Sequence, residues 1–353
     1  MTADWKQQRA GLRQRLQDAS GIPALAAVAR EFPAFQASMQ LQAVDAVEQA
    51  RQTTGLMDRL TRRIIHHVVA GRDRPAPGAW AWLACGSQGR GEQTVHTDQD
   101  NALVYADGLA AAADEWFSET ARQISKGLDA CGLAYCPGGV GPANQEWRRP
   151  VSSWRRAMLN VIRYPENRAV MLATHYLDLR VIDGPAELFD PLRNETLTVA
   201  SDNRRFMARL RHGATRPAPP LNVFGRLRTA WFGKNAGRLD LKQGGILPLV
   251  QLARCYAVRG GLPALHTLDR LQQAQAAGLL SEAGADALRE AYTSLTRIRA
   301  RLHAESIQDG KSLHNQLPIS RMTSAEQSDL RCAFRSIATM QQALRQAVLG
   351  EGL

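Results

Sequence analysis

Long apolar segments are missing from this sequence. No apolar run approaches the ~20 residues that a membrane-spanning helix requires. The N-terminal stretch MTADWKQQRAGLRQRL also lacks the apolar core of a signal peptide. These absences exclude a protein anchored by apolar helices and argue against export. We therefore expect a cytoplasmic protein with no membrane partner.

Cysteine is also scarce. The cysteines are odd in number and none lies in the C-x2-C spacing of zinc sites, so neither a disulfide framework nor a structural zinc site is indicated. We expect free, mostly buried thiols at Cys85, Cys131, Cys136, Cys255 and Cys332.

Lysine is rare although the chain is basic. The net charge is +11 and the pI is near 9.9, yet only five of the 44 basic residues are lysines. A basic surface attracts phosphates non-specifically, but an excess of arginine beside abundant Ala and Gly is also typical of GC-rich coding. The densest basic run, Arg204 to Arg238, is accompanied by neither an aromatic-rich RNA-binding strand nor a recognition-helix motif. Nucleic acid is therefore not an expected partner. A basic RNA-binding protein remains an alternative, which steep salt-dependent binding to RNA would support.

Length and hydrophobic pattern predict three regions. With 353 residues, of which 44% are hydrophobic, the chain can bury a substantial core. Residues 1–75 are predicted to be helical, with breaks at Pro23 and Pro33; strands alternate with helices in residues 76–198; and residues 199–353 are mainly helical. The fold class that follows is α+β, with a strand-containing region between two helical ones.

The C-terminal region shows clear helical periodicity. Four helices are predicted there, at residues 201–212, 246–258, 281–303 and 323–348. The last of them begins with a capping box formed by Thr323 and Glu326.

Two aspartates beside a glycine-rich turn carry most of the functional information. Trp80 to Ala84 is predicted to be a buried strand that stops before Gly86, and Ala102 to Tyr105 is predicted to be a second. Asp98 and Asp100 precede the second strand, and their spacing of two places both carboxylates on one side. Carboxylates this close repel each other unless a cation lies between them. The pattern favours a magnesium site.

Each part of this motif has a simpler interpretation. Taken singly, Gly86, Gly89 and Gly91 are compatible with a tight connection, and Asp98 with Asp100 is compatible with a solvated turn. The combination of strand, glycine turn, paired aspartates and strand favours the metal site over these alternatives. A further short strand is predicted at 133–136. The loop PGGVGP at 137–142 follows it, and its glycines are equally compatible with contact to a nucleotide and with a plain turn.

The string GSQGRGEQTVHTDQDNAL, residues 86–103, resembles the signature of the polymerase-β-like nucleotidyltransferase superfamily. That signature is a Gly-Ser or Gly-Gly turn, a spacer of similar length, and Asp-x-Asp or Asp-x-Glu. Within the superfamily the string is similar to the nucleotidyltransferase family related to the N-terminal catalytic region of protein-PII uridylyltransferases. The resemblance implies a polymerase-β-like core, a small mixed sheet with helices, flanked by N-terminal and C-terminal helical domains.

The superfamily carries a third carboxylate on a later strand. Residues 175–182, HYLDLRVI, are predicted to form it, because Leu177, Leu179 and Val181 alternate with polar positions. Asp178 is the candidate, and family members carry a similar Asp-Leu-Arg strand. The simpler alternative is an edge-strand aspartate paired with Arg180. By resemblance, Asp98, Asp100 and Asp178 are the catalytic residues and would hold one or two Mg²⁺ ions that bridge a triphosphate.

The glycine-rich turn is expected to bind the nucleotide. Gly86 and Gly89 let the backbone approach the phosphates, and the Ser87 hydroxyl donates hydrogen bonds to them. Arg90 is expected to make a bidentate phosphate contact. Glu92 is expected to pair with an arginine rather than to bind metal.

A second resemblance lies in the C-terminal region. The string RLDLKQGGILPLVQLARCYAVRGG, residues 238–261, resembles the substrate-binding domain that follows the catalytic domain in the same family. Lys242 is expected to reach the nucleotide from that domain, and its alternative is a solvated surface lysine. The chain has no room for the cyclic-nucleotide-binding and CBS modules of many relatives, or for the HD and ACT domains of uridylyltransferases, so the reverse reaction is not expected.

These features predict a nucleotidyltransferase that moves a nucleoside monophosphate from an NTP to an unidentified acceptor, for which a protein is one candidate. The alternative is a non-catalytic regulatory protein that binds nucleotides. The presence of all three candidate carboxylates argues against that alternative.

Overall fold

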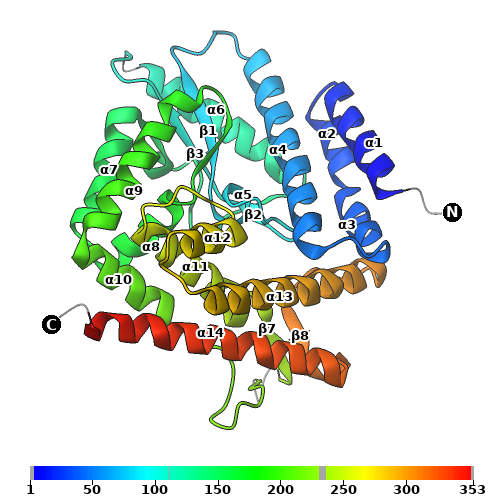
Figure 1. Ribbon diagram of the computed structural model, residues 1–353. Helices are drawn as coiled ribbons and strands as arrows, with labels where there is room; N and C mark the ends of the chain where they lie inside the picture. The colour runs from blue at the N-terminus through cyan, green and yellow to red at the C-terminus, as the bar shows by residue number, and fades with distance from the viewer. Residues whose placement is uncertain (1–3, 111, 230–235, 351–353) are drawn as a thin grey trace. The chain divides into compact units, whose positions relative to one another are not determined.

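The computed structural model describes residues 4–110, 112–229 and 236–350, which form two compact units (Figure 1). Within these ranges the first unit consists of residues up to 44, 48–161 and 172–196, and the second of residues 45–47, 162–171 and 197–350. The chain is mostly helical with small mixed sheets, which confirms the α+β class. No helix among the described residues is long and apolar enough to cross a membrane.

The N-terminal region is helical, as predicted. Pro23 and Pro33 stand in the first turns of α2 and α3, where the missing proline N–H costs no helical hydrogen bond. Most of this helical region lies in the same compact unit as the strands. The helices are α1 (Trp5–Asp18), α2 (Ile22–Ala29), α3 (Phe32–Leu41) and α4 (Ala46–Ala70).

A four-stranded sheet in the order β5-β3-β1-β6 forms the centre of the first unit. Its central pair is antiparallel, with Ala84 opposite Asn101, so the turn after β1 and the aspartates before β3 lie at the same end of the sheet. The same end is closed by Cys85, whose N–H donates to the Asp100 carbonyl at 2.8 Å. The strands are β1 (Trp80–Ala84), β3 (Asn101–Tyr105), β5 (Arg148–Pro150) and β6 (Arg180–Asp183).

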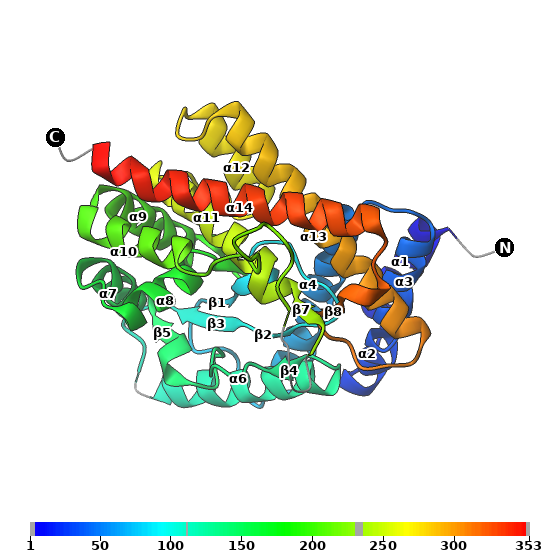
Figure 2. The same cartoon turned by 90° about the horizontal axis from the view of Figure 1, so that it is seen from below.

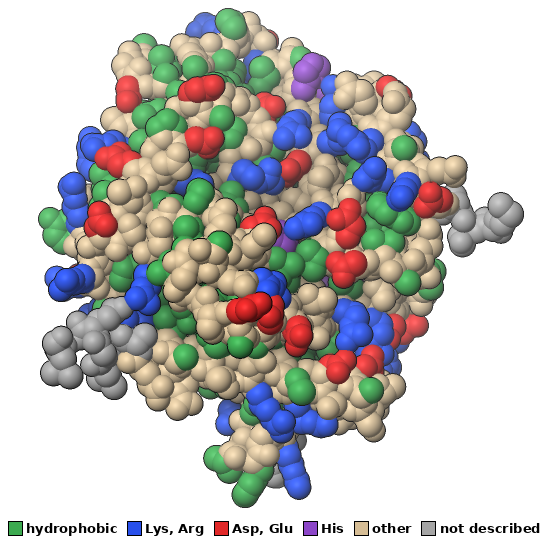
Figure 3. All heavy atoms as spheres, viewed as in Figure 1, with side chains coloured by type: hydrophobic (Ala, Val, Ile, Leu, Met, Phe, Trp, Pro, Cys, Tyr) green, Lys and Arg blue, Asp and Glu red, His purple; other side chains and the backbone are tan. Residues whose placement is uncertain are grey.

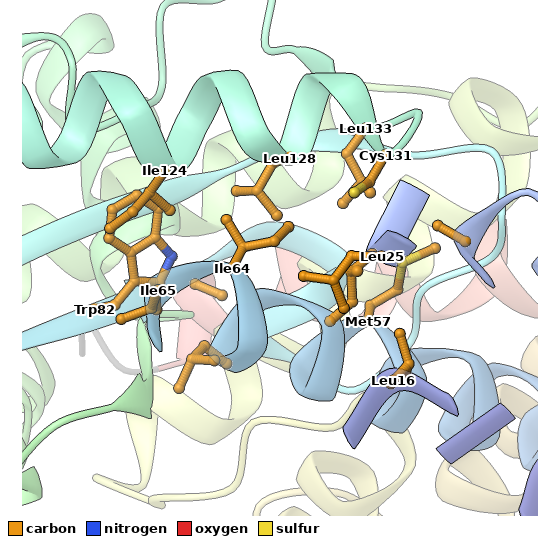
Figure 4. Packing of buried hydrophobic residues seen from close by; sticks show 14 of the residues in the cluster. Leu16, Leu25, Met57, Ile64, Ile65, Trp82, Ile124, Leu128, Cys131 and Leu133 are labelled. Atoms are coloured by element: carbon orange, nitrogen blue, oxygen red, sulfur yellow. The ribbon is translucent and has the colours of Figure 1, made fainter. Parts of the chain in front are cut away.

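Alternating side chains bury both faces of this sheet. Trp82 packs with Ile64 of α4 and with Ile124 and Leu128 of α6 (Ala112–Ala130) (Figure 4). The other face packs against aromatic residues such as Trp154. The remaining elements around the sheet are α5 (Gly86–Gly89), η1 (Gln145–Trp147), α7 (Val151–Arg163), α8 (Asn167–Tyr176), η2 (Ala186–Leu188) and α9 (Asp190–Asp202).

A separate two-stranded parallel sheet joins β2 (Asp98–Gln99) to β4 (Ala134–Tyr135). The short strand predicted at 133–136 is therefore confirmed. In the register Asp98 lies opposite Ala134 and Gln99 opposite Tyr135, so residue 136 follows the sheet at the level of Asp100.

The strand predicted at 175–182 begins later than expected. His175 and Tyr176 close α8, and the Asp178 N–H donates to the His175 carbonyl at 3.0 Å in the turn that follows. The strand itself starts at Arg180. Alternating apolar residues in so short a window fit a helix end and a turn as well as a strand, and here the preceding helix continues into it.

The second unit is a helical bundle with a small antiparallel sheet of two strands, β7 and β8, which lie far apart in the sequence; Figure 2 shows it from below. The four predicted helices are confirmed with shifted ends; Ser201 lies in the last turn of α9, and Asn203 caps α10. The predicted capping box also forms, because the Thr323 N–H donates to Glu326 and the Glu326 N–H donates to the Thr323 hydroxyl. The elements are α10 (Arg204–Thr215), β7 (Arg238–Asp240), η3 (Lys242–Ile246), α11 (Leu247–Arg259), α12 (Thr267–Ala276), α13 (Glu282–Gln308), β8 (Gln316–Pro318), η4 (Ile319–Arg321) and α14 (Ser324–Gly350).

Candidate functional site

The glycine turn that follows β1 packs directly against two candidate carboxylate segments. Gly86 has a φ of +59°, and a Cβ at this position would lie 2.4 Å from Oδ2 of Asp100. A Cβ on Gly89 would lie 2.1 Å from the backbone carbonyl oxygen of Asp178 and 2.8 Å from that of Ala84. All three distances are far below van der Waals contact, so a side chain at either position would force neighbouring atoms to shift.

Asp98 and Asp100 point to one side of the chain, as their spacing predicted. Both are half-buried, and their carboxylate oxygens form a group of possible metal ligands with the Cys136 sulfur, all within 4.8 Å of one another. The intervening Gln99 is buried and points elsewhere, because its side-chain amide donates to the carbonyls of Ser125 at 3.0 Å and Leu133 at 2.7 Å. Because side chains alternate along the strand, Asp98 and Asp100 face the site while Gln99 fixes the strand to the backbone on its other side.

Cys136 is a site residue that sequence reasoning did not find. Its spacing from the other cysteines carries no information about this position, which depends on the pairing of β4 with β2. Burial raises the pKa of its thiol, backbone hydrogen bonds from Val140 and Gly138 oppose the rise, and the nearby Asp100 carboxylate adds to it. The only sequence feature that pointed to a role for Cys136 is its place between a predicted strand and the PGGVGP loop.

The prediction of free, mostly buried cysteines is confirmed. All five are free; Cys85, Cys131 and Cys255 are buried, Cys136 is half-buried and Cys332 is exposed.

Asp178 lies in a buried ion-pair cluster. Its Oδ2 accepts a hydrogen bond from Nη1 of Arg90 at 2.6 Å, and Nε of Arg90 donates to Oε2 of Glu92 at 2.8 Å. Burial alone would lower the pKa of Arg90, but the two carboxylates outweigh it and raise this pKa. The predicted pairing of Glu92 with an arginine is thus confirmed.

Asp100 and Asp178 both act electrostatically on the buried thiol of Cys85. Burial raises the pKa of the Cys85 thiol well above its usual value, and the charges of Asp100 and Asp178 raise it further. Among the described residues, however, the group of possible metal ligands consists of Asp98, Asp100 and Cys136. Metal binding by Asp178 and phosphate binding by Arg90 stay predictions.

A second network holds the glycine turn in place. Arg180 pairs with Asp58 of α4 at 3.0 Å, and its guanidinium also donates to the backbone carbonyls of Gln88 at 2.9 Å and Gly89 at 3.2 Å. The Gln88 side chain donates to the same Asp58 at 3.1 Å. Arg180 is therefore paired with Asp58, not with Asp178 as the alternative interpretation of the sequence had it. No local sequence pattern predicts this network, because Asp58 lies far from the motif along the chain.

The loop between the turn and the aspartates is fastened to the N-terminal helices. The Gln93 N–H donates to the Thr54 hydroxyl at 2.9 Å, and the Val95 N–H donates to the side chain of Gln36 at 3.0 Å. These helices therefore help to position the site.

The remaining residues predicted to bind nucleotide are Ser87 and Lys242. Ser87 is half-buried in α5, and its carbonyl accepts from the Glu92 N–H at 2.8 Å. Lys242 is half-buried at the start of η3 in the second unit. Its contact with a nucleotide stays a prediction.

Comparisons with known proteins match two family models to the chain. Residues 30–168 match the model described as "Putative nucleotidyltransferase DUF294", and residues 204–348 match "Putative nucleotidyltransferase substrate binding domain". No curated protein matches the sequence significantly. The first match includes the glycine turn, both aspartates and Cys136, whereas Asp178 lies outside it.

Proposed function

We propose that this chain, which belongs to the family of nucleotidyltransferases with a C-terminal substrate-binding domain, transfers a nucleoside monophosphate from an NTP to an acceptor. The acceptor is unidentified, and a protein, as in the protein-PII uridylyltransferases, is the candidate we favour. We further infer that the small mixed sheet of the first unit is a polymerase-β-like core. Its central strands β1 and β3 carry the glycine turn and the aspartates to the same end, which supports this inference.

One observation carries the proposal: the carboxylates of Asp98 and Asp100 lie together beside a turn that contains no side chain at Gly86. Two half-buried carboxylates this close are stabilised by a divalent cation. Oxygen ligands of this kind suit Mg²⁺. When bound, one or two Mg²⁺ ions would neutralise the triphosphate and lower the proton affinity of the acceptor hydroxyl.

The other residues of the turn would hold and orient the nucleotide. The first N–H groups of a helical turn have no partner within it, so those at the start of α5 are free to donate to phosphate oxygens together with the Ser87 hydroxyl. Gly86 admits the phosphates close to the backbone. Lys242 would add a positive charge from the substrate-binding domain.

Asp178 is the proposed third carboxylate. Arg90 would then fix the direction of Asp178, and the network of Arg180 and Asp58 would fix the turn. In this arrangement catalysis rests on positioning and electrostatics.

The proposal is tested by incubation with Mg²⁺ and each α-labelled NTP in cognate cell extract. We expect label from one of the four NTPs to appear on a macromolecule or metabolite. If every NTP binds in a metal-dependent way and none transfers label, the alternative of a non-catalytic regulatory protein is correct. The engagement of Asp178 by Arg90 is the observation that favours this alternative.

A further inference from the structure

The first unit contains a second charged feature, a hollow between helices α1 and α4. Its volume is about 240 Å³, and four arginines line it together with Gly55 and Asp58. The arginines are Arg9 and Arg13 of α1 and Arg59 and Arg62 of α4. In Figure 3 basic side chains gather over the region where Figure 1 labels these two helices.

Helical spacing brings these residues together. Arg9 and Arg13 are four residues apart on α1, and Gly55, Arg59 and Arg62 follow each other at intervals of four and three on α4. Residues at such intervals share one face of a helix. Arg9 also donates to the side chain of Gln52 at 2.6 Å, which joins the two helices without neutralising its charge.

The positive charge of the hollow is poorly compensated. Among the described residues neither Arg13 nor Arg59 has an ion-pair partner, and burial together with the charges of Arg13 and Arg62 lowers the pKa of Arg59. Asp58 is an acidic residue of the lining, but Arg180 and Gln88 hold its carboxylate. Arg62 is turned toward other partners, since it donates to the Ile182 carbonyl at 2.7 Å and lies near Asp183. Arg13 and Arg59 are therefore the charges available to a ligand.

Gly55 lines the hollow without a side chain that would fill it. Glycine inside a helix is unfavourable relative to alanine, yet a Cβ at Gly55 would meet nothing within 4 Å. Packing therefore gives no reason for glycine at this position. A binding role does, because any larger side chain would occupy the space that the arginines surround.

We propose that this hollow binds a small phosphate-bearing anion, either free pyrophosphate or the phosphates of a nucleotide. Planar guanidinium groups donate paired hydrogen bonds to phosphate oxygens, and an anion would relieve the repulsion among the arginines. The lining of the hollow contains neither Asp98 nor Asp100, and binding by its arginines requires no metal. It therefore does not depend on the proposed transferase activity.

The test is calorimetric titration of the full chain with pyrophosphate, and in parallel with UTP and ATP, in buffer free of divalent metal. We expect binding to the parent protein, and a loss of about tenfold or more in affinity for Arg13→Gln and for Arg59→Gln. Arg156→Gln is the matched control, because Arg156 is an exposed arginine of the same unit outside the hollow. It should bind like the parent.

A second variant tests the shape of the hollow without changing its charge. Gly55→Leu should abolish binding while raising the melting temperature, since it replaces a helix-interior glycine. If pyrophosphate binds as tightly as nucleotides, the phosphates alone suffice; if only nucleotides bind, the nucleotide is the source. The proposal is overturned if no probe binds, if Gly55→Leu binds like the parent, or if Arg156→Gln weakens binding as much as Arg59→Gln. Tight binding of an RNA oligonucleotide that persists in Gly55→Leu would also overturn it, and would indicate a polyanion surface instead.

Discussion

Arg90 and Asp178 form an ion pair of 2.6 Å in which both side chains are buried, 8% and 1% exposed. Glu92 is the second carboxylate on the same guanidinium. Removing one member of a buried ion pair leaves the remaining charge buried without a partner, which is unfavourable. Arg90→Leu should therefore lower the free energy of unfolding by about 3–5 kcal/mol.

Urea denaturation measures this difference, and an exposed ion pair provides its control. Arg122 pairs with Glu119 on the surface of α6, with side chains 58% and 33% exposed. Arg122→Leu should change the free energy of unfolding by at most about 1 kcal/mol. Equal effects of the two substitutions would show that the buried cluster does not stabilise the first unit.

The two glycines of the turn should fail in different ways when replaced by alanine. At Gly86 the new Cβ meets the end of the Asp100 side chain, so Gly86→Ala should displace this carboxylate and weaken divalent-metal binding. At Gly89 it meets the backbone carbonyls of Ala84, in β1, and of Asp178, in the turn before β6, and neither can move without shifting the backbone around it. Gly89→Ala should therefore mainly lower stability.

Metal titration and thermal unfolding of both variants separate these effects. We expect Gly86→Ala to lose metal affinity with a smaller change in melting temperature than Gly89→Ala shows. The reverse order would mean that the contact of Gly86 with Asp100 does not control the position of the carboxylate.

Cys136 should be detectable as a metal ligand. Thiolates bind Co²⁺ and Zn²⁺ in preference to Mg²⁺, and the Cys136 sulfur lies within 4.8 Å of the carboxylate oxygens of Asp98 and Asp100. Co²⁺ bound to the parent protein should show near-ultraviolet absorption from a sulfur–cobalt bond. Cys136→Ser should lose this band, whereas Cys332→Ser, which changes an exposed cysteine of the second unit, should keep it. A band that survives in Cys136→Ser would remove Cys136 from the site.

Local sequence was sufficient for the elements of the site but not for its contacts. The strands around Asp98 and Asp100 were predictable because buried strands and period-two alternation are local properties. The contacts of Arg90 with Asp178 and of Asp58 with Arg180 join residues 88 and 122 positions apart, and no pattern in one sequence fixes such pairs.

Cys136 shows the same limit in another form. It reaches the aspartates only because β4 pairs with β2 in one register. The turn at Asp178 was missed because apolar alternation over a few residues fits a helix end followed by a turn as well as a strand. The third carboxylate is consequently the part of the proposed site that depends most on experiment.

The central claim is that the paired aspartates form a transferase site, and comparison of Asp100→Asn with the parent tests it most directly. The substitution keeps the size of the side chain and removes the charge that attracts metal. Label transfer from the α-labelled NTP should be abolished while the melting temperature stays the same or rises slightly, because repulsion between the carboxylates is relieved. Asp178→Asn should behave in the same way if Asp178 is the third carboxylate, and retained activity in it alone would place that ligand elsewhere. Label transfer by folded Asp100→Asn at the parental rate would contradict the account.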